Sequence, residues 1–323
     1  MNTLLSIENL YLNFKTDRGI VKVLDGITFS IKEGEVLGLV GETGCGKSVT
    51  AKCIIGLLPK NAQANGRIFY RGKDLSKLSY KSLEKLRGRE IAMIFQDPMT
   101  SLNPAYTIGN QIGEMFRIHK IKEDRSPEEN AIDMLKSVKI PDVEERIKQY
   151  PHQQSGGMRQ RAMIAMMLSC TPSLLIADEP TSSLDVTIQA QVLKLMKELK
   201  EKFSASILLI THDLGVVAEV ADRVIVMYAG QIVEISGIYE LFDNPVHPYT
   251  KGLLSTLPTG HKRGKKLEYI PGRVPDLINP PSGCRFHPRC SYATKICKEN
   301  KPYLYEVRKG HYAACHIIEE ERG

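Results

Sequence analysis

Residues 41–48, which read GETGCGKS, constrain the fold of this 323-residue chain more than any other segment. They match a pattern in which two glycines, with four residues between them, are followed by Lys and Ser. The glycines allow the backbone to curl until several N–H groups point at phosphate groups. Lys47 would supply a positive charge to those phosphates, and Ser48 a hydroxyl ligand to Mg²⁺. The segment predicts a phosphate-binding loop.

The residues on either side of this loop predict a strand before it and a helix after it. Residues 35–40 form a largely apolar run that is typical of a buried strand, and residues 48–58 favour a helix that Pro59 ends. A helix that starts at the loop directs its positive end toward bound phosphates. This context distinguishes a nucleotide site from an incidental glycine-rich turn.

The N-terminal third of the chain adds further strands. Residues 5–10 alternate like a strand, and residues 21–31 predict a second strand region that turns at Asp25-Gly26. Residues 91–95 form a short apolar strand that ends in a loop beginning with Gln96.

The middle of the chain changes to helical spacing and then returns to strands. Residues 107–148 predict helices, one of which starts at Ser126. Residues 174–177 and 207–210 are fully apolar strands with an amphipathic helix between them. The apolar face of that helix is marked by Val192, Met196 and Leu199. Strands that alternate with helices favour an α/β fold with a mostly parallel sheet, interrupted here by a helical insert.

Polar side chains follow two of these strands. Asp178 and Glu179 follow one, and His212 follows the other. A carboxylate at a strand tip can hold Mg²⁺ through water, which is the role expected for Asp178, while Glu179 could orient or deprotonate an attacking water. His212 should lie at the same carboxyl edge of the sheet, where ligands bind. An isolated Asp-Glu pair or a lone His is more often structural, so these roles depend on the phosphate loop.

Residues 155–157, Ser-Gly-Gly, predict a second anion site. Ser155 can cap a helix that runs on through Arg159 and Arg161 and presents its N–H groups to an anion. An isolated Ser-Gly-Gly would more often be a plain serine-capped helix. Because Lys47 already provides the anion site of its own subunit, we expect Ser155 here to serve the nucleotide of a facing subunit.

These motifs occur in the order seen in the nucleotide-binding subunits of ATP-binding cassette (ABC) transporters, which the chain resembles over roughly residues 4–242. The family's signature usually begins with Leu and ends with Gln, whereas this chain has Gln154 and Met158. The resemblance implies an α/β P-loop NTPase (RecA-like) core with an antiparallel β subdomain and an inserted α-helical signature subdomain. It also implies ATPase activity that uses ATP and Mg²⁺.

The same resemblance assigns roles to individual residues. Gln96 is the glutamine that joins the metal site to the membrane partner, Phe14 stacks on adenine in preference to Tyr11, and the loop 183–185 crosses a dimer interface. The implied catalytic residues are Glu179, His212, Gln96 and Lys47, and the implied magnesium ligands are Ser48, Gln96 and Asp178. The implied nucleotide contacts are Phe14, Gly41, Glu42, Thr43, Gly44, Cys45, Gly46, Lys47, Ser48, Val49 and Gln96, with Ser155, Gly156, Gly157 and Asp185 acting in trans.

Beyond the cassette, residues 244–250, 270–272 and 280–290 resemble a narrower group, the oligopeptide and dipeptide importer ATPases. The resemblance implies a peripheral subunit at the cytoplasmic face of the membrane that powers peptide uptake. Its partners would be two permease subunits, a second ABC ATPase that is identical or homologous, and, indirectly, an extracytoplasmic peptide-binding protein. Nickel and sugar importers share this tail type and remain alternatives.

Composition supports a location in the cytosol. No apolar stretch approaches the ~20 residues that cross a bilayer, and the N-terminus lacks the features of a signal peptide. The net charge of +7 is concentrated between residues 261 and 311, where twelve Lys and Arg face four Asp and Glu. This basic tail could be a nucleic-acid surface of a soluble ABC ATPase. Such ATPases usually carry two cassettes or a long coiled-coil insertion, and the sequence shows neither, so this alternative is less favoured and no nucleic acid partner is expected.

The chain divides into a nucleotide-binding domain at 1–245, with the helical insert at about 99–160, and a Cys-rich extension at 246–323. The extension contains Cys284, Cys290, Cys297 and Cys315. Four thiols in a reducing compartment suggest a metal centre, and the absence of a short Cys-x₂₋₄-Cys pair favours a [4Fe–4S] cluster over Zn²⁺. Ordinary buried cysteines are the third possibility.

Overall fold

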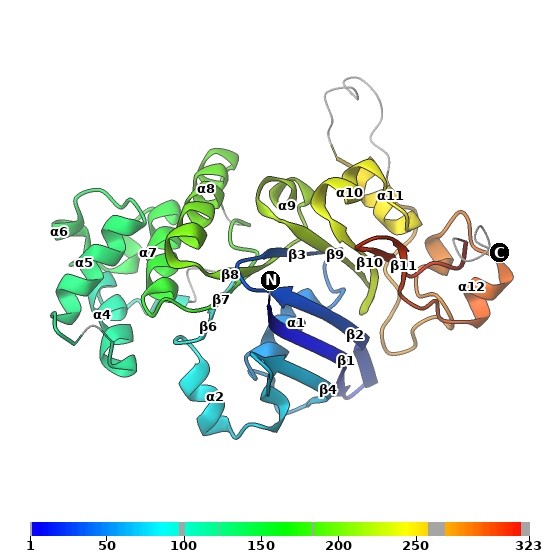
Figure 1. Ribbon diagram of the computed structural model, residues 1–323, viewed down its shortest axis with the longest axis horizontal. Helices are drawn as coiled ribbons and strands as arrows, with labels where there is room; N and C mark the ends of the chain where they lie inside the picture. The colour runs from blue at the N-terminus through cyan, green and yellow to red at the C-terminus, as the bar shows by residue number, and fades with distance from the viewer. Residues whose placement is uncertain (1, 97–100, 122, 183, 258–268, 318–323) are drawn as a thin grey trace. The chain divides into compact units, whose positions relative to one another are not determined.

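The computed structural model describes residues 2–96, 101–121, 123–182, 184–257 and 269–317 (Figure 1). The chain forms two compact units, each assembled from separate stretches of sequence. The helical unit comprises Met1–Asn2, Lys32–Glu35 and Leu78–Ile210, and the phosphate-loop unit comprises Thr3–Ile31, Val36–Lys77 and Thr211–Gly323.

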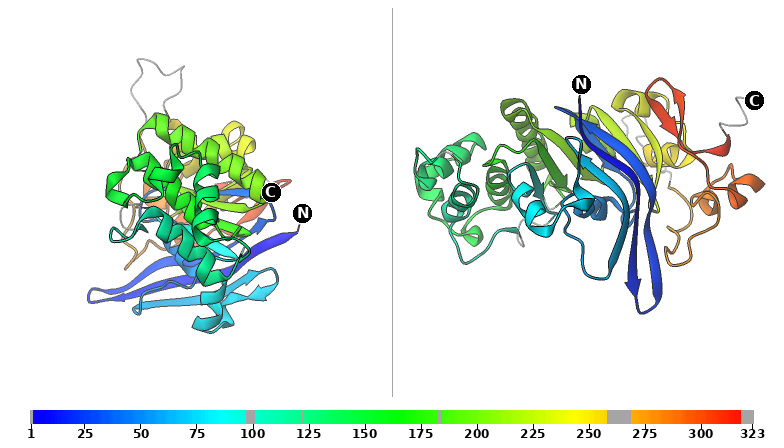
Figure 2. Two further views of the ribbon diagram at one scale, coloured as in Figure 1. Left: turned by 90° about the vertical axis from the view of Figure 1, so that its left-hand side faces the viewer. Right: turned by 60° about the horizontal axis from the view of Figure 1, so that its bottom comes forward.

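The phosphate-loop unit contains two groups of strands. The first has the order β2-β1-β4-β5, in which β4 pairs antiparallel with both β1 and β5 (Figure 2). The second has the order β11-β12-β10-β9-β3, in which β3 and β9 are parallel and the remaining pairs are antiparallel. The strands are β1 Thr3–Thr16, β2 Gly19–Lys32, β3 Val36–Val40, β4 Ala62–Tyr70, β5 Lys73–Asp74, β9 Arg223–Tyr228, β10 Gln231–Gly237, β11 Tyr305–Arg308 and β12 His311–Ala313. The helices are α1 Lys47–Ile54, α9 Leu214–Val220, α10 Ile238–Asp243, α11 Pro248–Ser255 and α12 Lys295–Glu299, with short 3₁₀ turns at Leu75–Lys77 and His287–Arg289.

The helical unit combines three parallel strands, in the order β8-β7-β6, with the helices expected in the middle of the chain. Its elements are β6 Ile91–Ile94, β7 Leu174–Asp178, β8 Ser206–Thr211, α2 Tyr80–Leu86, α4 Ile108–His119, α5 Pro127–Ser137, α6 Val143–Arg146, α7 Gly156–Leu168 and α8 Val186–Phe203, with a 3₁₀ turn at Pro151–Gln153. All residues of β6, β7 and β8 are buried, as expected for apolar strands covered on both faces.

Local signals placed several helices correctly. Ser126 and Glu129 form a reciprocal capping box at the start of α5, where Pro127 occupies the first helical position. On α8, the predicted apolar face is buried, since Val192, Met196 and Leu199 are at most 5% exposed.

Helix α1 is shorter than the sequence predicts. It ends at Ile54, because Gly56 adopts a positive φ of 64° just beyond it. The Leu57 N–H donates to the Lys52 carbonyl, and the Gly56 N–H donates to the Cys53 carbonyl. These two bonds form the Schellman arrangement, which satisfies the last carbonyls of the helix and stops it before Pro59.

Strand β2 also differs from its prediction. It continues from Gly19 to Lys32 without the turn expected at Asp25-Gly26. Gly26 does have a positive φ of 71°, but a β-carbon there would lie 2.7 Å from the Tyr11 hydroxyl oxygen. The glycine therefore provides room for an aromatic side chain within a long strand, rather than reversing the chain.

Within the residues that the structure describes, we find no helix that is both long and apolar enough to cross a membrane.

Candidate functional site

The loop that follows β3 requires glycine at two positions. Gly41 has a φ of 151°, and a β-carbon there would lie 2.1 Å from the Met227 carbonyl oxygen. Gly46, the residue before α1, has a φ of 107°, and a β-carbon there would lie 2.6 Å from a methyl carbon of Leu24. Both conformations are accessible mainly to glycine. The local geometry is thus a tightly curled loop that leads directly into a helix N-terminus.

Lys47 is held inside this loop. Its side chain is 5% exposed, and its ammonium donates to the Gly41 carbonyl at 2.7 Å and to the Glu42 carbonyl at 3.2 Å. Cys45 is fully buried beside it, and burial raises the pKa of the Cys45 thiol. A buried cation against backbone carbonyls suits the capture of an anion, because the anion would provide a stronger partner for the ammonium.

The helical unit brings three of the predicted residues to the ends of two neighbouring strands. Asp178 is the last residue of β7 and is 4% exposed. Gln96 lies two residues beyond the end of β6, and its side-chain amide donates to a Glu179 carboxylate oxygen at 3.0 Å. Glu179 has a positive φ of 46°, which is uncommon for a residue that is not glycine and typical of strained functional positions.

His212 and Phe14 belong to the phosphate-loop unit. His212 is exposed directly after β8, and the next residue, Asp213, caps α9 by accepting a bond from the Gly215 N–H at 2.8 Å. Phe14 lies on β1, opposite Ala62 of β4, and is half-buried. The ring of Tyr11 packs against the backbone of Gly26.

The Ser-Gly-Gly segment forms a capped helix N-terminus, as expected. Ser155 precedes α7, and its hydroxyl accepts a bond from the Met158 N–H at 3.4 Å. A β-carbon on Gly157 would lie 2.9 Å from Ile188, so this glycine allows α7 to approach α8 closely. Asp185 caps α8, since its carboxylate accepts a bond from the Ile188 N–H at 3.0 Å. Ser183, the first residue of the predicted interface loop, lies outside the described residues.

Two residues of the extension contact the phosphate loop directly, and neither was predicted to do so. The Tyr249 hydroxyl oxygen accepts a bond from the Glu42 N–H at 2.9 Å. Arg289 forms a two-pronged ion pair with the Glu42 carboxylate, with N···O distances of 2.6 and 3.1 Å. Both residues lie in the segments 244–250 and 280–290, which resemble those of peptide importer ATPases.

The four-cysteine metal centre is the part of the sequence prediction that proved wrong. Over the described ranges, no three or more His, Cys, Asp or Glu side chains form a group that could hold a metal ion. Burial raises the pKa of Cys284 and of Cys315 to about 11 each, and it also raises the pKa of Cys290. Neither an iron–sulfur cluster nor zinc is supported. Cys297 and Cys315 are buried, whereas Cys284 and Cys290 are half-buried.

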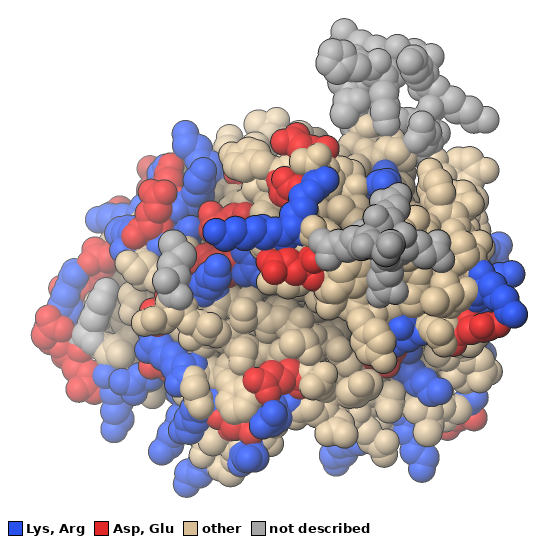
Figure 3. All heavy atoms as spheres, turned by 45° about the vertical axis from the view of Figure 1, so that its right-hand side comes forward, with Lys and Arg blue, Asp and Glu red and all other residues tan. Residues whose placement is uncertain are grey.

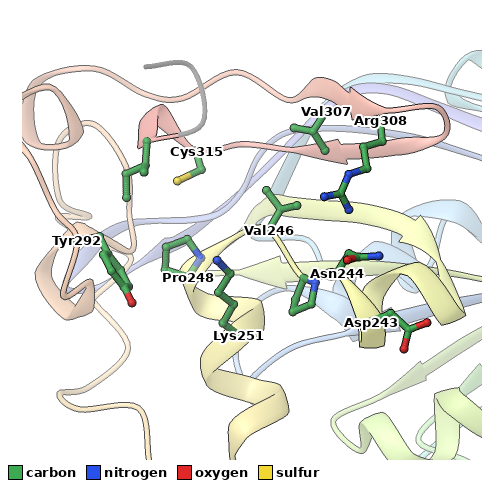
Figure 4. A pocket seen from close by; sticks show the side chains of 11 residues that line it. Asp243, Asn244, Val246, Pro248, Lys251, Tyr292, Val307, Arg308 and Cys315 are labelled. Atoms are coloured by element: carbon green, nitrogen blue, oxygen red, sulfur yellow. The ribbon is translucent and has the colours of Figure 1, made fainter. Parts of the chain in front are cut away.

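A pocket of about 740 Å³ lies in the C-terminal part of the phosphate-loop unit (Figure 4). Cys315, Tyr292 and Lys251 border it, together with residues of α10 and β11. No residue of the loop 41–48 lines this pocket. The pocket is therefore separate from the phosphate loop.

Comparison with known proteins agrees with this arrangement of motifs. A family model described as "ABC transporter" matches residues 24–182, and one described as "Oligopeptide/dipeptide transporter, C-terminal region" matches residues 233–297. The dipeptide transport ATP-binding protein of Bacillus subtilis is 51% identical over 94% of this chain and 91% of the relative. Its Escherichia coli counterpart is 46% identical over 99% of this chain and 98% of the relative.

Solved structures support the same fold. An ATP-binding cassette in a dimeric post-hydrolysis state, bound to ADP and Pi, aligns with a TM-score of 0.65 and 25% identity over 72% of this chain and 98% of its own. A Clostridium perfringens chain described as part of an ABC transporter complex aligns with a TM-score of 0.65 and 29% identity over 76% of this chain and 92% of its own. The fold and the loop define an ATP-binding cassette. The chain belongs to the ABC transporter family, in the group of oligopeptide and dipeptide transport ATP-binding proteins, and is an ATPase.

Proposed function

We propose that this chain is the ATP-hydrolysing subunit of an importer that takes up dipeptides or oligopeptides. The main support is the match of residues 233–297 to the oligopeptide/dipeptide transporter C-terminal region. Two dipeptide transport ATP-binding proteins are also 51% and 46% identical to this chain over 94% and 99% of its length. Nickel and sugar importers are the alternatives within the same transporter class.

The proposed ATP site uses the residues already described. Lys47 and the amides of the loop 41–48 bind the phosphates, and Phe14 stacks on adenine. Bound Mg²⁺ would neutralise charge on the phosphates, and Ser48, Gln96 and Asp178 would supply the oxygen ligands that it prefers. The burial of Lys47 in the phosphate-loop unit and the position of Asp178 at a strand tip of the helical unit each support the role proposed for that residue.

Hydrolysis then needs a base and a group that stabilises developing charge. Glu179 accepts a bond from the Gln96 amide, which holds its carboxylate in one direction and supports its assignment as the group that polarises water. His212 stabilises charge in the transition state.

We assign the capped N-terminus of α7 to the nucleotide of a facing ATPase subunit, with Ser155, Gly156 and Gly157 as the contacts. Asp185 belongs to the same proposed interface, although in this structure its carboxylate caps α8. Closure of two such cassettes on two ATP molecules would drive two permease subunits at the cytoplasmic face of the membrane, and the extracytoplasmic peptide-binding protein would deliver cargo to them. The division into a cassette at 1–245 and an extension at 246–323 belongs to the same proposal.

The charges in the part of the extension that the structure describes argue against a nucleic acid surface. Of the eight Lys and Arg between residues 261 and 311 that the structure describes, five form ion pairs with carboxylates. They are Arg285, Arg289, Lys295, Lys301 and Arg308. On the face drawn in Figure 3, basic and acidic side chains are interspersed. Backbone recognition of nucleic acid instead uses a continuous basic surface.

Glu179→Gln tests the hydrolytic part of this proposal. The amide cannot accept a proton from water, so we expect the turnover number for ATP to fall at least ~10²-fold while the dissociation constant for ATP changes little. Steady-state hydrolysis and direct nucleotide binding on the full chain measure both. Unchanged turnover would remove Glu179 from its role.

The cargo is tested by reconstituting the chain with its permease and binding-protein partners in vesicles. We expect ATP-dependent uptake of labelled dipeptides or oligopeptides, and no such uptake with the Glu179→Gln chain. Uptake of Ni²⁺ or of a sugar in place of peptides would favour the alternative importers.

A further inference from the structure

Two separated motifs of the extension contact one residue of the phosphate loop, and a third motif holds one of the contacting side chains. The segment 244–250 provides Tyr249, whose hydroxyl accepts the Glu42 N–H. The segment 280–290 provides Arg289, which pairs with the Glu42 carboxylate, and the segment 270–272 provides backbone carbonyls that hold Arg289. The proposed function uses these motifs only to recognise a transporter group. The contacts on Glu42 therefore call for a separate explanation.

Arg289 is fixed on every side. Its Nε donates to the Pro271 carbonyl at 2.9 Å, and its guanidinium lies 5.7 Å from the centre of the Tyr228 ring. A β-carbon on Gly272, which has a positive φ of 80°, would lie 3.1 Å from the Arg289 stem, so glycine gives the stem its room. The Arg289 side chain is 5% exposed, whereas many surface ion pairs are mobile and contribute little. This pair is built to hold one geometry.

Tyr249 is fixed equally well. It is fully buried in an aromatic cluster, 4.7 Å from the Tyr228 ring and 5.4 Å from the Phe286 ring. His247 caps the helix that carries it by accepting the Tyr249 N–H at 3.0 Å. Burial lowers the pKa of His247 to about 4, so this cap is neutral near pH 7.

Glu42 is an acidic residue in a loop that is proposed to bind an anion. Glu42 is the residue after Gly41, and the negative charge of its carboxylate opposes the approach of phosphates to the loop. The Arg289 guanidinium neutralises that charge and fixes its direction. The Tyr249 contact engages the Glu42 N–H, which orients the peptide plane at the start of the loop.

We propose that Arg289, supported by Tyr249, is a positioning residue of the ATP site that preshapes the phosphate loop by holding Glu42. The extension then contributes to ATP binding by positioning Glu42. Folding of the extension and binding of ATP therefore stabilise one another. This inference rests on the proposed role of the loop 41–48 in binding ATP.

Arg289→Ala in the full chain tests the inference. We expect the dissociation constant and the KM for ATP to rise about tenfold, with the turnover number little changed, because a buried charge-assisted bond is lost while the catalytic groups remain. Arg289→Lys keeps the charge but loses the two-pronged geometry, so we expect an intermediate rise of about threefold. An unchanged ATP affinity in either variant overturns the inference.

A double-mutant cycle separates positioning from a general loss of stability. In a Glu42→Gln background the carboxylate is absent, so we expect Arg289→Ala to change ATP affinity less than about twofold. An equal tenfold loss in both backgrounds would show that Arg289 acts through the fold and not through Glu42. The matched control is Arg308→Ala, which removes another ion pair of the extension, with Glu240, and should leave ATP affinity unchanged.

Lys47→Ala distinguishes failure of this inference from failure of the proposed function. If Lys47→Ala loses ATP binding while Arg289→Ala does not, only the inference fails. If Lys47→Ala also binds ATP normally, the assignment of the phosphate loop itself is wrong.

Discussion

The phosphate loop at residues 41–48 and the cysteine segment at residues 284–315 belong to the same compact unit but are held by different forces. The loop requires glycine at two positions, because Gly41 and Gly46 occupy conformations that other residues rarely adopt, and Tyr249 and Arg289 contact the loop at Glu42. The cysteine segment is held by side-chain packing and ion pairs, including the Phe286 ring and the Arg289 guanidinium. A spacing motif specifies a site when the backbone geometry itself demands those residue types. The four cysteines between residues 284 and 315 are not required by the backbone conformation in this way.

The largest effect is expected from Lys47→Ala. Removal of a buried ammonium from the phosphate loop should raise the dissociation constant for ATP at least ~100-fold. Equilibrium titration with nucleotide provides the measurement. Lys52→Ala, a half-buried lysine in the last turn of the same helix, is the matched control and should bind ATP normally. If the Lys47→Ala chain bound ATP with unchanged affinity, the loop motif would not specify a binding site any more than the cysteine spacing does.

A pair of glycine variants tests whether the backbone shapes the loop. A β-carbon on Gly41 collides with the Met227 carbonyl, whereas one on Gly44, with a φ of 82°, meets nothing within 4 Å. We expect Gly41→Ala to lower the free energy of unfolding by about 3 kcal/mol, and Gly44→Ala, which adds only backbone strain, by about 1 kcal/mol. Chemical denaturation of both chains measures the difference. Equal losses would mean that the close contact at Gly41 relaxes.

Ser155→Ala extends the comparison to a side-chain cap. Loss of the bond to the Met158 N–H should lower the free energy of unfolding by about 1 kcal/mol. The control is Ser137→Ala on α5, where the hydroxyl bonds back to the Asp133 carbonyl within the helix and alanine should be close to neutral. A thermal or denaturant melt compares the two, and identical stability of both variants would argue against the cap.

The smallest effect is expected in the cysteine segment. Cys290 is half-buried and burial raises its pKa, so Cys290→Ser should leave ATP turnover within about twofold of the original. Elemental analysis of the purified parent chain should find no stoichiometric iron or zinc. If the parent protein were brown and contained iron and acid-labile sulfide, and the variant lost both, the conclusion that the cysteines form no metal site would be wrong.

Local signals in the sequence predicted much of the fold. The caps at Ser126 and Ser155, the buried strand before Gly41 and the apolar face of α8 each depend on residues close together in the chain. The same reasoning failed at two positions. Gly26 predicted a turn, but Tyr11 of a neighbouring strand fills the space above it. Pro59 predicted the end of α1, but the Schellman bonds at Gly56 end it earlier.

The sequence by itself determined the phosphate loop, several strands and helices of the cassette, and the transporter family, because these follow from local backbone demands and contiguous motifs. Only the tertiary structure decided that Tyr249 and Arg289, more than 200 positions away from Glu42, meet at the loop. It also decided that the four cysteines form no metal site. The physical reason is the same for both: convergence of side chains distant in sequence depends on how the whole unit packs, and spacing along the chain does not encode it.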